Sequence, residues 1–514
     1  MKRSATTSGS AETGDTPPGR RATLLFLALA VTAMAVAALE SLILPALPML
    51  QSDLDIRPAK AATWAVALTV SAAISTPLAG SLADLHGPRR TMAGVLLLVT
   101  CGGLVSAAAH SYTMFLVGQI LMGTGTGVIP IGFVVLRSLY APDRLKAPMG
   151  TFMAAITAGN CAGVLFAGPI ANSLSRAWMY ALPTLCAAAG GVLFHLTAAG
   201  LRTPASEMAR PGGKARPGGK AGPSRVDWPG AATLAVGLAL LFIWLDRAPK
   251  DGWGAATSLA LVASSVVVLV GWVYVENRVE HAMVAPALLR RRGIWGPVSV
   301  GVAQGWIYSM VVYLVPQLLA LPKATGLGLG ANASEIGYYL CAALAAAVLS
   351  SPLAGLAARH VGSRVVAGVG MVSLAAGALT PAYHHEPWQI VCGLVLTGIG
   401  AAAGSTAIFV VAASAVAPEQ LGVATALTTV ARALGGAVGT QVAALIMTHN
   451  PILVPGGPPS DDGFRIAYLT AMAIAVAAVG LVFAFPRDAP ARPTRSRVRV
   501  PAAAPSSLPD GPPA

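Results

Sequence analysis

The chain contains fourteen apolar stretches, each close to the length that an α-helix needs to cross a membrane. A spanning helix requires about 20 apolar residues, because the hydrocarbon layer is about 30 Å thick. The first stretch covers about residues 23–48 and the last about 465–486. Charged residues make up only 11% of the 514 residues, which is too little polar surface to coat a soluble globule. The sequence therefore predicts an all-α integral membrane protein with fourteen transmembrane helices.

Basic residues are distributed unevenly over the connections between these stretches. If the N-terminus is cytoplasmic, 26 of the 34 Lys and Arg fall in the tails and even-numbered connections, and 7 fall in the odd-numbered ones. Because cytoplasmic loops carry the excess of positive charge, we expect a multi-pass protein of the cell membrane with both termini cytoplasmic. This topology also accounts for the net charge of +14, so no nucleic-acid partner is expected.

A short basic segment after the second stretch recurs, in degraded form, in the second half of the chain. Residues 77–90 read PLAGSLADLHGPRR, and residues 352–364 read PLAGLAARHVGSR. Two copies about half a chain apart, each between long apolar stretches, predict two similar helical bundles. The corresponding positions are Gly80 and Gly355, Gly87 and Gly362, Arg89 and Arg364, and Asp84 and Arg359.

The first copy resembles the signature between the second and third helices of the major facilitator superfamily, a Gly-x-Leu-x-Asp-x-x-Gly-x-Arg-Arg pattern. A plain positively charged loop would explain the arginines but not the ordered glycines, which suit a tight turn between close helices. The acid and the arginines would form a charge cluster at helix ends. The resemblance implies the major facilitator fold, in which two bundles rock about a central site. The residues that carry it are Gly80, Leu82, Asp84, Gly87, Arg89 and Arg90.

The position of the repeat divides the fourteen stretches into two six-helix bundles and an inserted pair. This layout resembles the fourteen-helix drug:proton antiporter branch of the superfamily. Segments rich in Gly, Pro and charge are expected to be disordered tails or a flexible linker. The expected segments are an N-tail 1–21, a first bundle 22–200, a linker 201–227, an inserted pair 228–276, a loop 277–294, a second bundle 295–486 and a C-tail 487–514.

One carboxyl lies well inside an apolar stretch. Glu40 is placed among apolar residues of the first stretch, at a position that resembles the acid of a family motif in the first helix. Holding an ionised carboxylate in a span costs about 3 kcal/mol on insertion scales, so the side chain favours its protonated form unless a cation pairs with it. Glu40 is therefore the predicted proton carrier. The alternative is an acid near the outer interface that reaches headgroup water.

The fourth and fifth stretches extend the resemblance. Family members usually have Arg at the position of Gln119, and Gln119 can hydrogen-bond a substrate or water but supplies no positive charge to tune Glu40. The fifth stretch resembles an antiporter motif that ends in Gly-Pro-x-x-Gly-Gly. A proline there would permit a bend during alternating access, although each glycine alone also fits ordinary helix packing. The residues of this motif are Gly159, Gly163, Gly168 and Pro169.

Polar and aromatic side chains inside other stretches are candidates for the substrate cavity. Arg432 is either paired structurally or serves the substrate or the coupling, because an unpaired guanidinium in a membrane is costly. Aromatic faces bind organic cations or flat drugs, but each also fits an interface belt or packing. Arg137 is expected to be a cytoplasmic anchor. The cavity candidates are Gln119, Trp64, Trp306, Tyr308, Tyr313, Gln317 and Arg432.

The sequence contains no Walker lysine loop, no clustered histidine ligands and no Gly-x-Ser-x-Gly elbow, so we expect neither an enzyme nor a metal or cofactor site. The five cysteines lie in apolar stretches and are expected to pack there. Together with the resemblance, these residues predict a monomeric exporter in the lipid bilayer, which exchanges protons for small hydrophobic or amphiphilic molecules such as antibiotics. The alternatives are an importer or facilitator of a native metabolite, and a non-transporting membrane sensor.

Overall fold

The computed structural model of the chain is all-helical over the residues that it describes. The expected N-tail up to residue 19, the linker 201–227, most of the loop 277–294 and the C-tail 487–514 lie outside the described residues. The end of the first stretch, at residues 43–48, also lies outside them. The structure describes residues 20–42, 58–140, 144–173, 176–199, 228–278, 292–323, 327–331, 333–383, 386–416, 420–449, 460–483 and 485.

The first half of the chain forms six helical spans and the following segment forms two. In the fourth span, a short 3₁₀ helix, η1, interrupts the α-helix between α5 and α6. The first six spans consist of α1 Arg20–Ser41, α3 Pro58–His86, α4 Pro88–Ala107, α5 Tyr112–Met122 with η1 Gly123–Gly127 and α6 Val128–Leu139, α7 Lys146–Ser173 and α8 Arg176–Thr197. The next two spans are α10 Trp228–Asp251 and α11 Ala256–Arg278.

The last six spans complete the set of fourteen. Thirteen of the helices are long and apolar enough to cross a membrane, and α10 has a shorter apolar core at Pro229–Leu245. The prediction of an all-α membrane protein with fourteen helices is therefore confirmed within the described residues. The last six helices are α13 Arg292–Ala320, α14 Ala333–His360, α15 Ser363–Tyr383, α16 Pro387–Ser414, α17 Leu421–His449 and α18 Asp461–Val482.

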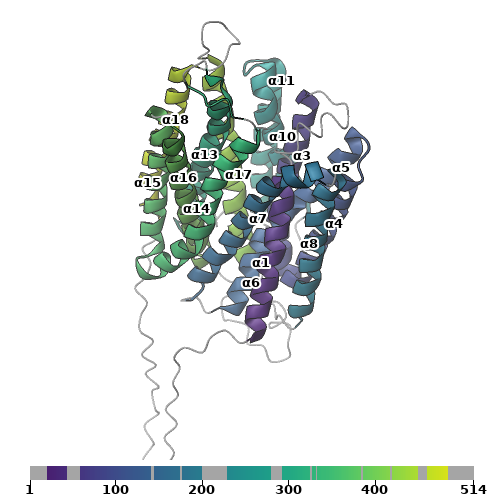
Figure 1. Cartoon of the computed structure of the whole chain (residues 1–514). Coiled ribbons are helices and arrows are strands. Elements are labelled where there is room, and N and C mark those ends of the chain that lie inside the picture. Colours follow the sequence, from purple (N-terminus) through teal and green to yellow (C-terminus); the bar gives the residue numbers. More distant parts are fainter. Residues whose placement is uncertain are drawn as a thin grey trace, which may run out of the picture.

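The two groups of six helices pack in the same way. In the first group α1 packs on α7 and α8, and α4 packs on α5 and α8; in the second group α13 packs on α17 and α18, and α15 packs on α16 and α18. Figure 1 shows the groups side by side, with the second group in green and the first in purple and blue. They meet where α3 packs on α17 and where α7 packs on α14. Helices α3 and α7 of the first group correspond to α14 and α17 of the second, so these two contacts are equivalent.

The inserted pair is attached at the first of these two interfaces. Helix α10 packs against α3 and α17, and α11 packs on the outside of α10. An apolar cluster holds it there, in which Leu234 and Leu238 of α10 and Trp272 of α11 meet Val423 and Val430 of α17. The pair therefore covers one side of the joint between the bundles rather than forming part of either core.

Glycines at equivalent places let the helices of each bundle approach closely. Gly159 of α7 lies against the backbone of Met34 in α1, and Gly435 of α17 lies against the backbone of Val302 in α13. Inside a membrane, helix association depends on such close packing, because lipid tails are as apolar as the helix surface. One turn further along, Gly163 meets Ala38 and Gly439 meets Trp306. Both helix pairs are therefore held in the same register.

The two copies of the repeated basic segment adopt the same turn. Gly87 precedes α4 and Gly362 precedes α15, and both have a φ of +90°. At each glycine the carbonyl accepts a 3.3 Å hydrogen bond from the amide four residues later, that of Thr91 or Val366. A residue with a Cβ is strained in this region of φ, so the turn requires glycine.

We predict that Gly87→Ala and Gly362→Ala each lower the stability of the folded protein by about 1 to 3 kcal/mol, because the left-handed φ is costly for alanine. The measurement is thermal unfolding of the purified protein in detergent. Gly94→Ala and Gly368→Ala are the matched controls, since they lie in α4 and α15 where an added methyl group meets no atom within 4 Å. Equal losses of stability in all four variants would contradict the claim that the turns at residues 87 and 362 require glycine.

Candidate functional site

One end of the protein is held closed by polar contacts between the bundles. We call this end, at which α1 begins and α3 finishes, the terminal end. There the carboxylate of Asp84 accepts hydrogen bonds from the amides of Gly422 at 3.2 Å and Val423 at 3.3 Å. These amides belong to the first turn of α17, where the helix dipole attracts negative charge. An added Cβ on Gly80, one turn before Asp84, would lie 2.5 Å from the carbonyl oxygen of Gly422, so glycine permits this contact.

The second copy of the segment makes the equivalent contact with the opposite charge. Nζ of Lys146, the first residue of α7, donates a 2.9 Å hydrogen bond to the carbonyl of Ala358 near the end of α14. Gly355 lies against the backbone carbonyl of Lys146, as Gly80 lies against Gly422. Cations are favourable near a helix C-terminus. An anion therefore holds one joint and a cation holds the other, and Arg359, which replaces the acid in the second copy, is exposed.

Two further arginines make contacts with other helices at this end. Arg137 donates from Nη1 to the carbonyls of Ala413 at 2.9 Å and Val416 at 3.2 Å, at the end of α16 in the other bundle. The expectation of a simple anchor for Arg137 is therefore incomplete, because the residue joins the bundles. The Nη2 atom of Arg89 lies 3.0 Å from Nε2 of His195 on α8.

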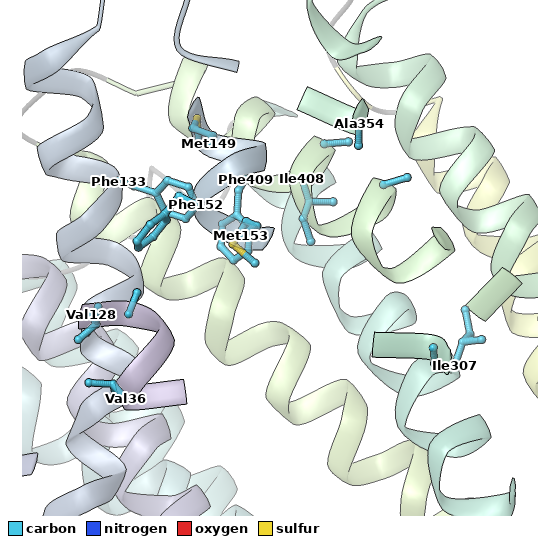
Figure 2. Close-up of a cluster of buried hydrophobic side chains, with 14 of the residues drawn as sticks. Val36, Val128, Phe133, Met149, Phe152, Met153, Ile307, Ala354, Ile408 and Phe409 are labelled. Atoms are coloured by element: carbon cyan, nitrogen blue, oxygen red, sulfur yellow. The ribbon is translucent and has the colours of Figure 1, made fainter. Parts of the chain in front are cut away.

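Three phenylalanines fill the space behind these polar contacts. Figure 2 shows Phe133 of α6, Phe152 of α7 and Phe409 of α16 lying together, with Met149 and Met153 nearby. The ring of Phe133 lies 4.9 Å from that of Phe409 and 5.7 Å from that of Phe152, measured between centroids. All three side chains are buried. Because Phe409 comes from the second bundle, the cluster seals the terminal end in this conformation.

Glu40 lies at mid-depth in the first bundle. Its Oε1 atom is buried and has no hydrogen-bond partner among the described residues, although the side chain as a whole is partly accessible. A methyl group on Gly125 would come 2.8 Å from this oxygen and 2.6 Å from Cγ1 of Val36. Gly125 lies near the middle of the span Tyr112–Leu139, so the carboxyl is also near the middle rather than at the interface.

A 3₁₀ helix that was not predicted from the sequence faces Glu40. Residues 123–127 read GTGTG, and glycine at alternate positions weakens an α-helix. The hydroxyl of Thr126 lies 2.8 Å from that of Thr76 and donates to the carbonyl of Ala72, both on α3. A 3₁₀ segment within a longer helix often marks a hinge or strain. The three glycines were the signal that would have found this break.

Tyr308 occupies in the second bundle the place of Glu40 in the first. The contacts of Gly159 and Gly435, and those of Gly163 and Gly439, pair α1 with α13 at a constant offset of 268 residues (34 with 302, 38 with 306). The same offset pairs residue 40 with 308. Tyr308 lies within electrostatic range of Arg432 on α17. The structure therefore brings these two cavity candidates together.

Other candidates lie apart from these two groups. Trp64 is fully buried, and its ring packs 4.6 Å from that of Phe115 inside the first bundle. Gln119 is also fully buried, and its Nε2 donates to Oγ of Ser106 on α4 at 3.2 Å. Neither side chain faces accessible space in this conformation. Trp306 and Tyr313 are partly buried, and Gln317 is exposed.

The antiporter-like motif is described in part. Gly159 and Gly163 form the contacts of α7 with α1, whereas the side-chain environment of Gly168 and Pro169 lies outside the described residues. The described residues contain no group of three side chains that would hold a metal ion.

The chain matches the model of a known protein family, and it shares its fold with a solved structure. The model of the Major Facilitator Superfamily matches residues 26–324 and 317–508. The crystal structure of the human organic anion transporter MFSD10 (TETRAN) has a TM-score of 0.62 and is 17% identical, and the match covers 91% of this chain and 100% of that chain. At this level of identity the similarity shows a common fold.

Three curated relatives have names that describe transport or drug resistance. The chain is 28% identical over 450 residues to the cephamycin export protein CmcT of Amycolatopsis lactamdurans, with 84% of this chain and 87% of that protein covered. It is 25% identical over 386 residues to the multidrug resistance protein Stp of Mycobacterium tuberculosis, with 74% and 67% covered. It is 25% identical over 387 residues to the uridine/deoxyuridine transporter of Lactococcus lactis subsp. cremoris, with 73% and 76% covered.

We predict that Asp84→Asn weakens the closure of the terminal end, because the neutral amide loses the attraction to the first turn of α17. That attraction is worth about 0.3 to 2 kcal/mol, so the closed population should fall by up to about thirtyfold relative to the open one. The measurement is the distance distribution between spin labels at His86 and Ser414, which are exposed in the two bundles, after the native cysteines are replaced by serine.

The matched control is Arg359→Gln at the equivalent, exposed position of the second copy. It should leave the distance distribution unchanged. If Asp84→Asn also leaves it unchanged, the carboxylate does not hold the bundles together.

Proposed function

Because the chain belongs to the Major Facilitator Superfamily, we propose that it is a proton-coupled exporter of small hydrophobic or amphiphilic organic compounds. We further propose that it belongs to the fourteen-helix drug:proton antiporter branch. The bundles would be residues 22–200 and 295–486, with the inserted pair at 228–276. The observation that carries the proposal is the carboxyl of Glu40, which lies at mid-depth with Oε1 buried beside a break in its neighbouring helix.

The position of Glu40 supports its role as the proton carrier. The ionised form costs about 2.5 to 3.5 kcal/mol at the centre of a span, whereas the neutral acid avoids this cost. A change in the surroundings of Oε1 therefore changes the proton affinity. The partners that would change are η1, through Gly125, and Val36 and Val99, which lie beside Gly125.

The charge distribution supports an orientation for the closed end. The excess of Lys and Arg on the side of the two termini supports a cytoplasmic terminal end. The conformation with Asp84 on α17 and the phenylalanine cluster in place is then closed to the cytoplasm. In the proposed cycle, Glu40 takes up a proton from outside in this conformation, and it releases the proton after the terminal end opens and substrate binds.

The membrane potential provides enough energy for export. One proton that moves inward through 100 mV yields about 2.3 kcal/mol, which supports about a fiftyfold gradient of a neutral substrate. The names of two relatives, a cephamycin export protein and a multidrug resistance protein, support the outward direction and an antibiotic-like substrate.

A second candidate function is the import of a native metabolite. A relative of nearly the same identity is named a uridine/deoxyuridine transporter, and the same fold and proton carrier would serve uptake. The direction of substrate movement distinguishes the two. An importer would accumulate a labelled compound in energised whole cells, and an exporter would deplete it.

We predict that expression of the wild-type chain raises the resistance of a susceptible host to at least one compound of an antibiotic panel, and that Glu40→Gln removes that resistance. The glutamine keeps the size of the side chain but carries no ionisable proton. Glu335→Gln, the same substitution at an exposed residue of α14, is the control and should keep the resistance. Resistance that survives Glu40→Gln would refute the coupling role but leave the export function.

We predict that Gly125→Ala lowers the efflux rate by about tenfold at wild-type protein levels. The added methyl group overlaps with Oε1 of Glu40 and with Val36, and overpacking of this kind costs about 1 to 3 kcal/mol. Gly337→Ala in α14, where a methyl group meets no atom within 4 Å, is the control. A wild-type efflux rate in Gly125→Ala would mean that the contact between η1 and Glu40 has no role in transport.

A further inference from the structure

Arg432 is a positive charge inside α17 whose hydrogen-bonding capacity is not used up by the described residues. Its Nε atom is buried and has no hydrogen-bond partner among them. Guanidinium remains charged in proteins, and a charge within a span normally faces a partner. Within the described part of the chain, Tyr308 is the titratable group that lies within electrostatic range of Arg432, and its neutral phenol carries no counter-charge. No described carboxylate therefore neutralises it.

Helix α13 and the ring of Phe409 lie against Arg432, which remains partly accessible. Gly305 of α13 lies directly against the backbone of Arg432, and a methyl group on Gly301 would come 3.3 Å from its Cγ. The guanidinium carbon lies 5.9 Å from the ring centroid of Phe409, which belongs to the cluster that seals the terminal end. Arg432 and Tyr308 are each partly accessible. These surroundings thus offer a partly accessible cation and a partly accessible phenol.

These contacts leave the positive charge only partly compensated. A cation at this distance from an aromatic ring gains less than it would from one hydrogen bond to a charged group. A neutral phenol supplies a dipole but no counter-charge. An anion placed against Arg432 would accept hydrogen bonds from the free N–H groups of the guanidinium and from the hydroxyl of Tyr308.

We propose that Arg432 and Tyr308 form an anion subsite for the transported compound, which is an organic carboxylate with an apolar, ring-sized body. The planar guanidinium matches the two oxygens of a carboxylate, and the partly accessible ring of Tyr308 offers an aromatic face for the body. A phosphate dianion would require a second cation, and no other Lys or Arg lies well inside the apolar stretches. This inference rests on the proposed function and narrows its substrate class.

The test measures equilibrium binding to the full-length protein in nanodiscs of zwitterionic lipid. The probes are naphthylacetic acid, its methyl ester and naphthylethylamine, which share one ring system and differ in charge. The acid should bind the wild type at least tenfold more tightly than the ester or the amine. Acetate, which lacks the ring system, should bind at least tenfold more weakly than naphthylacetic acid.

Substitutions test whether Arg432 and Tyr308 cause the preference for the acid over the ester. Arg432→Gln should weaken binding of the acid by about tenfold to a hundredfold and remove the difference between acid and ester. Tyr308→Phe should weaken it by about threefold to tenfold. Arg465→Gln, an exposed residue in the first turns of α18, should bind like the wild type. If Arg432→Gln does not fold by its melting curve, Arg432→Lys should keep the preference for the acid at reduced affinity.

Several results would overturn the proposal. They are a wild type that binds the acid no more tightly than the ester, an Arg432 variant that keeps wild-type affinity for the acid, and binding of acetate as tight as that of the acid. Since binding is measured without a gradient, it is independent of transport direction and of Glu40. A preference for the acid without any efflux would refute the exporter assignment alone, and efflux without such a preference would refute the subsite alone.

Discussion

Close approach of helix backbones at glycine is the constraint on which the arrangement of this protein depends. Gly159 on Met34 and Gly435 on Val302 hold α1 and α13 in the same register within their bundles. Because lipid gives little hydrophobic drive for one helix to prefer another, these contacts determine which side chains meet. They bring residue 40 and residue 308 to equivalent depths, and they bring Arg432 against α13.

The two bundles share a scaffold but differ in charge. At the terminal end, Asp84 caps α17 in one joint, and Lys146 binds a carbonyl of α14 in the other. At mid-depth, the first bundle carries an acid, Glu40, and the second carries the cation Arg432. This asymmetry suits the proposed exchange, since a monoanion that leaves and a proton that enters move two charges in the favourable direction. The yield is then about 4.6 kcal/mol per 100 mV, twice that for a neutral compound.

The number of helices and the internal repeat could be predicted from the sequence, because apolar length and the glycine pattern of residues 77–90 are local signals. The neighbours of each side chain could not be predicted. A spanning helix is apolar on all sides, so its sequence does not reveal which face meets another helix. Gln119 and Trp64 therefore looked like cavity residues but pack inside the first bundle. Arg137 looked like an anchor because its partners, carbonyls on α16, have no signature in the sequence.

Infrared difference spectroscopy tests most directly whether Glu40 is the group that takes up and releases the proton. Spectra of the reconstituted protein at acidic and alkaline pH, with and without a transported compound, follow the carbonyl band of protonated carboxyl groups. The account predicts one band that shifts on addition of the compound and is absent from Glu40→Gln. A band that responds to the compound in the same way in both proteins would contradict it.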